Sequence, residues 1–60
     1  MKDKLKSVRI EKGLTQQQLA DLIGVKRQNV GRWETGEFEP SLKNLKRIAE
    51  ALEIDIKELI

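Results

Sequence analysis

One short stretch of the sequence, KRQNVGR at positions 26–32, concentrates side chains that form paired hydrogen bonds. An arginine guanidinium forks onto the O6 and N7 acceptors of guanine, and a glutamine amide pairs with the N6 and N7 groups of adenine. Both residue types occur here, as Arg27, Gln28 and Arg32, with Lys26 and Asn29 beside them. The stretch holds three basic residues and no acidic one. Its chemistry suits the recognition of base edges and phosphates.

The apolar residues in and after this stretch show how a helix would display these groups. At about 100° per residue, Val30 and Trp33 fall on one face, with Glu34 beside them. Trp33 could stack on a base, but its spacing from Val30 predicts a place in the core. The opposite face and the leading turn then carry Arg27, Gln28, Arg32 and Thr35.

The composition argues against catalytic and metal-binding chemistry. The chain has 60 residues and contains neither Cys nor His. Disulfides, thiolate or imidazole metal ligands and the usual nucleophile–base pairs are therefore excluded. A chain of this length forms one domain at most, here residues 1–60, with little volume for a substrate pocket. We expect no enzyme, cofactor, metal site or small-molecule ligand.

Targeting and membrane signals are missing from the sequence. The longest apolar run is two residues, which is far too short to span a bilayer. Met1 is followed by a segment of mixed charge, unlike a signal peptide. The absence of Cys fits a reducing compartment. We expect a cytoplasmic protein that does not bind membranes.

The charge pattern is more informative than the net charge of +2. Residues 34–39 carry three acids and no base, in contrast to the basic stretch just before them. Residues 50–60 carry four acids and one base. This pattern favours one basic surface and an acidic end, although charges that only solvate helix faces explain it equally well.

Capping residues and glycines predict the first three helices. Asp3 would cap the first helix. Thr15 opens the second, at about residues 15–23, because Thr15 and Gln18 form the pattern of a capping box. A glycine ends that helix, and the third runs over about residues 26–35 before another glycine.

Two more helices complete an all-α prediction. Pro40 and Ser41 begin the fourth helix, and Asp55 with Glu58 opens a short fifth. No segment alternates with period two, so strands are not expected. The second and third helices, joined by a short turn at Gly24, have the pattern of a helix-turn-helix unit. The residues of the fourth helix that helical spacing places inward are Leu42, Leu45, Ile48, Ala49 and Leu52.

Short motifs along nearly the whole chain match one known family in register. They are Arg9, Gly13-Leu14-Thr15-Gln16, Leu19-Ala20, Gly24-Val25, Glu34 with Gly36, Pro40-Ser41-Leu42 and Leu59. Through these motifs the chain resembles the phage-repressor/Cro-type (XRE-type) helix-turn-helix DNA-binding domain. The resemblance implies a lambda-repressor-like fold of five short helices, whose third helix enters the major groove. It further implies a bacterial or phage-encoded, sequence-specific regulator of transcription, in particular a repressor bound to an operator in double-stranded DNA.

The resemblance also assigns the base-reading residues. The base-reading positions of the family fall on Arg27, Gln28 and Arg32 of this chain, with Asn29 as an additional reader. The N-terminal residues of a helix that enters the groove end-on meet the base edges, which agrees with these positions.

Phosphate contacts are expected at the starts of helices, where free N–H groups and the helix dipole favour anions. The family residue that matches Gln16 bonds the DNA backbone. Gln17 is a better candidate than Gln18, because the capping box occupies Gln18. The full set of expected phosphate contacts is Gln16, Gln17, Lys26, Lys43 and Asn44.

A structural ion pair is implied between Arg9 and Glu34. A lone carboxylate on the inner flank of the third helix would be costly to bury. In the family this glutamate is paired with the arginine, which ties the first helix to the third. Arg9 is therefore expected to be structural, without a DNA contact.

The chain departs from the family pattern at three places. Lys26 stands where the family usually has a Ser or Thr that caps the third helix. Glu37 and Glu39 stand in a loop that often carries basic residues, which weakens the case for phosphate contacts there. Phe38 in the same loop packs on the fourth helix or faces a partner subunit.

Gly31 has two interpretations. It either allows close approach to DNA or simply fills a position where any small residue suffices.

A homodimer on a palindromic operator is expected, because one such module reads only a few base pairs. Ile56, Leu59 and Ile60 supply the apolar surface for it, although packing into the domain's own core would explain the same residues. Two other functions stay open. One is an antitoxin or restriction-modification controller of the same fold, and the other is a protein-interaction module that does not read DNA.

Overall fold

The computed structural model describes the backbone of residues 2–60 and the side chains of residues 4–60. It contains four α-helices and one 3-10 helix, and no strand occurs within the described range. The elements are α1 (Lys2–Glu11), α2 (Gln16–Ile23), α3 (Arg27–Thr35), α4 (Leu42–Leu52) and η1 (Ile56–Leu59). The all-α prediction is confirmed. The prediction of five α-helices is wrong by one, because the last element has only four residues and closes as a tighter 3-10 turn.

The predicted capping signals fix where most helices begin. The Thr15 hydroxyl accepts from the Gln18 N–H, and the Gln18 side chain accepts from the Thr15 N–H, which completes the predicted capping box of α2. Asp55 and Glu58 form the same arrangement at η1. Asp3 is a correction, since α1 already begins at Lys2 and Asp3 lies inside the helix.

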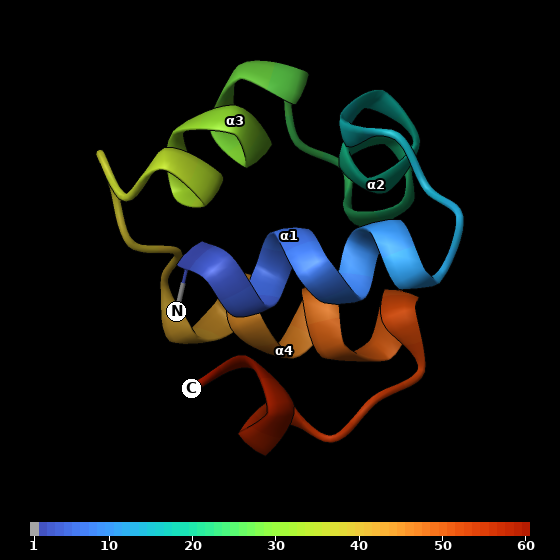
Figure 1. The fold of residues 1–60 in the computed structure, drawn as a ribbon. Coiled ribbons are helices and arrows are strands. Elements are labelled where there is room, and N and C mark those ends of the chain that lie inside the picture. The colour runs from blue at the N-terminus through green and yellow to red at the C-terminus, as the bar shows by residue number, and fades with distance from the viewer. Residues whose placement is uncertain (1) are drawn as a thin grey trace.

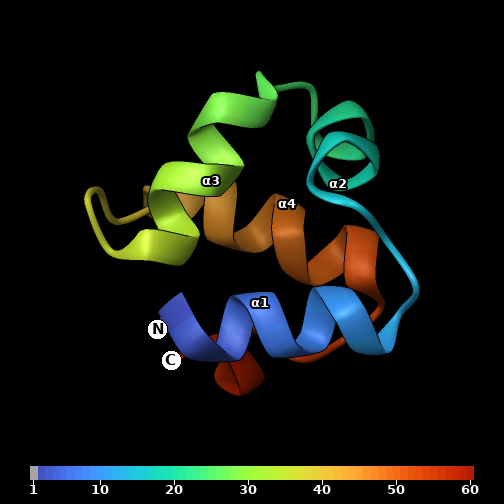
Figure 2. The ribbon, with the colours of Figure 1, turned by 45° about the horizontal axis from the view of Figure 1, so that its top comes forward.

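The five helical elements pack around one core. α2 packs against α3 and α4, and α1 packs against α3. The 3-10 helix η1 packs against α4 and α1. In Figure 1 α2 and α3 lie on one side of α1 and α4, and η1 lies on the other; Figure 2 again shows η1 on the side of α1 away from α2 and α3. The Lys4 ammonium donates to the backbone carbonyl of Ile60 at 2.6 Å, which joins the first turns of α1 to the residue after η1.

Every element contributes buried apolar side chains to this core. Leu42 is a correction, because its residue is 63% exposed although helical spacing placed it inward. It occupies the first position of α4, beyond the reach of the core that Ile48 and Leu52 enter. The buried hydrophobic residues are Leu5, Leu19, Ala20, Ile23, Val30, Trp33, Ile48, Ala49, Leu52 and Leu59.

One of the three chain-end residues expected at a dimer surface is buried. Leu59 is fully buried in the core of its own chain, so it is not available to a partner subunit in this structure. Ile56 is half-buried against the same core. Ile60 alone of the three is exposed, at 64%. Core packing therefore explains Leu59, because η1 has to cover α1 and α4.

Candidate nucleic-acid interface

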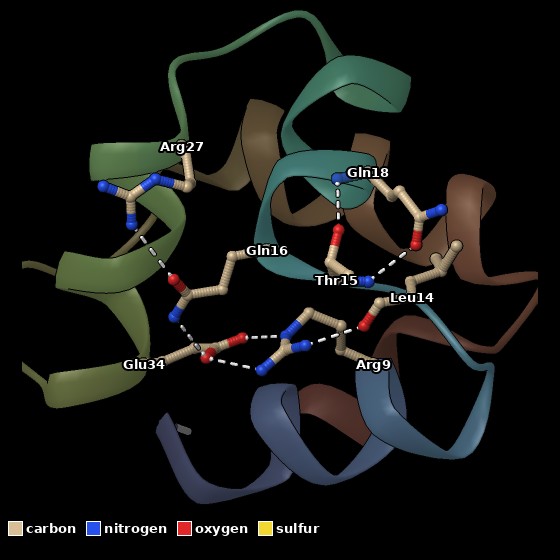
Figure 3. Close-up of polar contacts among 7 residues, drawn as sticks. All are labelled: Arg9, Leu14, Thr15, Gln16, Gln18, Arg27 and Glu34. Carbon is tan, nitrogen blue, oxygen red and sulfur yellow. Dashed lines mark hydrogen bonds and ion pairs between the residues drawn. The ribbon is translucent and has the colours of Figure 1, made fainter.

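A buried ion pair fixes α3 to α1. The Arg9 guanidinium contacts the Glu34 carboxylate through two hydrogen bonds, Nε to Oε2 at 2.6 Å and Nη2 to Oε1 at 3.1 Å (Figure 3). The two side chains are 9% and 4% exposed. The third nitrogen, Nη1, donates to the Leu14 carbonyl at 2.7 Å. Arg9 thus ties together α1, α3 and the loop between α1 and α2, and its polar groups point inward.

The amide of Gln16 extends this buried pair to the start of α3. Its Nε2 donates to Glu34 Oε1 at 3.0 Å, and its Oε1 accepts from Arg27 Nη1 at 3.3 Å. Figure 3 shows the four side chains as one continuous series of contacts from α1 to the first residue of α3. Because Glu34 takes the amide N–H, the amide oxygen faces Arg27, which has no acceptor of its own to offer.

The helix α3 divides its side chains between the core and the surface. Val30 and Trp33 are buried, and Trp33 is only 6% exposed, which excludes it as a stacking platform. Gln28 is exposed and Asn29 is half-buried. The buried residues hold the helix in place, and its polar outer face is left open.

Arg32, also on the outer face of α3, has partners in the loop that follows. Its Nε lies 3.4 Å from Glu37 Oε2, and its guanidinium carbon lies 5.7 Å from the centre of the Phe38 ring. Phe38 is 53% exposed, so it is not inserted into the core. Its ring lies against the Arg32 guanidinium instead.

The expected phosphate-contacting residues lie at three helix starts. Gln17 is exposed and bonds Asp21 one turn along α2, at 2.9 Å. Lys26 is the N-cap residue of α3 and makes no side-chain capping bond. Lys43 is exposed and Asn44 half-buried in the first turn of α4. No side-chain hydrogen bond in residues 4–60 links this turn to the Gln16–Arg27 contact, so the structure does not join these residues into one cluster.

The contacts of Gln16 and Phe38 were not predicted from the sequence. Gln16 and Glu34 are 18 positions apart, and no local pattern signals their contact. A partial signal existed for Arg32, because the acidic loop follows directly after the helix that carries it.

Gly31 is not required by the packing of the chain. A Cβ at this position would meet only the Gln16 amide, at 3.9 Å, which is ordinary van der Waals contact. The backbone is helical here, so an L side chain fits. Nothing within the described structure therefore demands glycine.

The described residues contain neither a membrane-spanning helix nor a metal-binding cluster. None of the helices has the length and apolar character needed to cross a bilayer. Across the described part of the chain, no group of three His, Cys, Asp or Glu residues is placed to hold a metal ion.

Residues 5–59 match the helix-turn-helix family. The chain belongs to this family. The resemblance inferred from the sequence motifs is thereby confirmed. The crystal structure of the restriction-modification controller protein C.AhdI from Aeromonas hydrophila has the same fold, with a TM-score of 0.94 and 41% identity over 98% of this chain and 89% of that one.

Two curated relatives are regulators from prophage or phage. The chain is 42% identical over 59 residues to the cryptic phage CTXphi transcriptional repressor RstR of Vibrio cholerae, covering 98% of this chain and 53% of the repressor. It is 38% identical over 58 residues to the SPbeta prophage-derived uncharacterized HTH-type transcriptional regulator YonR of Bacillus subtilis, covering 97% of this chain and 54% of that protein. The helix-turn-helix chain described here thus spans about half the length of these relatives.

Proposed function

We propose that residues 1–60 form one DNA-binding domain of a transcription regulator, a repressor that reads an operator through the major groove. The observation that carries this proposal is the division of α3, whose buried side holds the helix while Arg27, Gln28 and Arg32 stand on the exposed side. A helix fixed in this way presents forked donors and an amide to base edges with little loss of backbone freedom on binding. The names of the relatives support the same function.

The proposed base readers are Arg27, Gln28 and Arg32, with Asn29 as an additional contact. The phosphate contacts proposed with them are Gln16, Gln17, Lys26, Lys43 and Asn44. The N-terminus of α2 favours an anion because its first N–H groups have no partner within the helix. Gln16 keeps one amide hydrogen beyond the one it donates to Glu34, so it can bond a phosphate without releasing α3.

The proposed partner is a palindromic operator bound by a homodimer. Two copies would read half-sites one helical turn apart, about 34 Å, and so gain the specificity that one module lacks. Ile60 is the exposed apolar residue of the chain end that supports this arrangement, together with the exposed edge of Ile56. We propose a cytoplasmic location on the same basis as the regulator function.

A restriction-modification controller is a second candidate, supported by the close structural match to C.AhdI. It would bind operator DNA in the same way and differ in the genes it controls. A protein-interaction module is a third candidate, supported by the two acids that follow α3, Glu37 and Glu39.

Selection from a pool of random duplexes, repeated at two salt concentrations, tests the proposal. We expect one palindromic sequence to be enriched, with affinity that falls steeply as salt rises. Arg27→Ala should lower the preference for one base pair by about 1–3 kcal/mol, whereas Lys12→Ala, a charge change in the turn after α1, should not. A pool that shows no enrichment would overturn the proposal in favour of the interaction module.

A further inference from the structure

We infer that Glu37 and Phe38 are positioning residues for Arg32, which they hold in a direction that suits one guanine. The inference rests on the proposed function and goes beyond it. The loop after α3 places the Glu37 carboxylate and the Phe38 ring on the same arginine.

The backbone holds this loop close to Arg32. The Phe38 N–H donates to the Arg32 carbonyl at 3.3 Å. Thr35 Oγ1 donates to the same carbonyl at 3.1 Å and accepts from the Glu37 N–H at 3.4 Å. Glu37 and Phe38 are therefore attached to the end of α3 itself. Their backbone is held in place beside Arg32, although the side chains of Arg32, Glu37 and Phe38 are exposed to solvent.

The atoms involved leave the reading end of Arg32 open. Glu37 contacts Nε, and Phe38 lies against the guanidinium group at a distance within reach of a cation–π interaction. Within residues 4–60 no hydrogen bond is formed by Nη1 or Nη2 of Arg32. These two nitrogens form the fork that pairs with guanine O6 and N7. A long side chain that would otherwise sample many rotamers is thus restrained with its fork unoccupied.

The same carboxylate has a second, opposite effect on binding. A negative charge beside the DNA backbone lowers affinity for every duplex, whatever its sequence. Removal of Glu37 is therefore expected to strengthen general binding and to weaken discrimination at one base pair. Glu39 lies two positions further along the loop, and its removal should produce only the general effect, because no hydrogen bond or ion pair joins Glu39 to Arg32 in the described structure. The two residues form a matched pair.

The test compares Glu37→Gln, Glu39→Gln and Phe38→Leu on the duplex enriched from the random pool and on its single-base-pair variants. Arg32→Ala first identifies the base pair whose discrimination depends on Arg32. At that base pair we expect Glu37→Gln and Phe38→Leu each to reduce discrimination by about two- to fivefold, as for an exposed ion pair or cation–π contact. Glu39→Gln should leave it unchanged. In an Arg32→Ala background, Glu37→Gln should cause no further loss of discrimination.

Several results would overturn the inference. Equal effects of Glu37→Gln and Glu39→Gln on every duplex would reduce Glu37 to a general charge effect. If Arg32→Ala lowers discrimination at no base pair, Arg32 does not read a base, and Glu37 and Phe38 have no reading residue to position. Circular dichroism melting of each variant separates these results from unfolding, and a variant that melts early is tested below its transition. A wild type that enriches no duplex overturns the proposed function itself, which is a different outcome from enrichment with unchanged discrimination.

Discussion

Arg9→Ala is the substitution whose cost can best be worked out from the structure. It removes both hydrogen bonds to a Glu34 carboxylate that is 4% exposed, and it leaves the Leu14 carbonyl without its donor. Gln16 remains as the one side-chain donor to the carboxylate in the described structure. Loss of one partner of a buried ion pair costs about 3–5 kcal/mol, because the other charge stays buried.

The expected loss is large compared with the stability of so short a chain. At about 0.05–0.15 kcal/mol per residue, sixty residues are stable by roughly 3–9 kcal/mol. A loss of about 3 kcal/mol already lowers Tm by at least about 12 °C in a domain of this size. Arg9→Ala should therefore melt much earlier than the wild type, or be largely unfolded at room temperature.

Thermal melting followed by circular dichroism measures this effect, with Lys6→Ala as the control on the exposed face of the same helix. The double variant Arg9→Met/Glu34→Leu provides a second comparison. It removes both charges and fills their space with apolar groups, so it should recover a large part of the loss. A Tm of Arg9→Ala within about 3 °C of that of Lys6→Ala would refute the reasoning, since a buried unpaired carboxylate cannot be that inexpensive.

Three further substitutions test other parts of the chain. Gly31→Ala should raise the free energy of unfolding by about 1 kcal/mol, because the added Cβ meets no close atom; a lower Tm would contradict this. Lys26→Ser should supply the side-chain cap that α3 lacks and raise the free energy of unfolding by about 1 kcal/mol. If Lys26 contacts a phosphate, the same substitution should also reduce the slope of log affinity against log salt concentration by about 1. Glu53 has a φ of 57°, so Glu53→Gly should stabilise by about 0.5 kcal/mol in chemical denaturation, whereas Glu50→Gly inside α4 should destabilise by about 1 kcal/mol.

Local signals in the sequence predicted the helix starts well, and distant contacts were beyond them. Thr15 with Gln18, and Asp55 with Glu58, are three residues apart, so one turn of backbone brings each pair together. Leu42 was wrongly placed in the core, because helical spacing tells which residues share a face but not how far the neighbouring elements extend to cover it. For Leu59 the sequence left two roles open, a dimer surface and core packing, and only the folded chain shows that it is buried.

The candidate site shows the same limit. Burial of Val30 and Trp33 followed from their spacing, and the polar outer face of α3 followed with it. The contact between Arg9 and Glu34 was expected only from the family resemblance, since 25 positions separate them. The orientation of the Gln16 amide depends on a carboxylate from another helix, which only the folded structure could reveal.

The contact between Lys4 and Ile60 makes this fold suitable for covalent duplication. Lys4, near the start of α1, lies beside Ile60, and η1 lies on the side of α1 and α4 away from α2 and α3 (Figure 1). A linker from residue 60 of one copy to the start of a second would therefore avoid the outer face of α3 in both. An extended linker of roughly a dozen residues reaches about 40 Å, enough to span neighbouring half-sites. Such a single-chain tandem would bind two half-sites at an effective concentration set by its linker, independent of how strongly the separate copies associate.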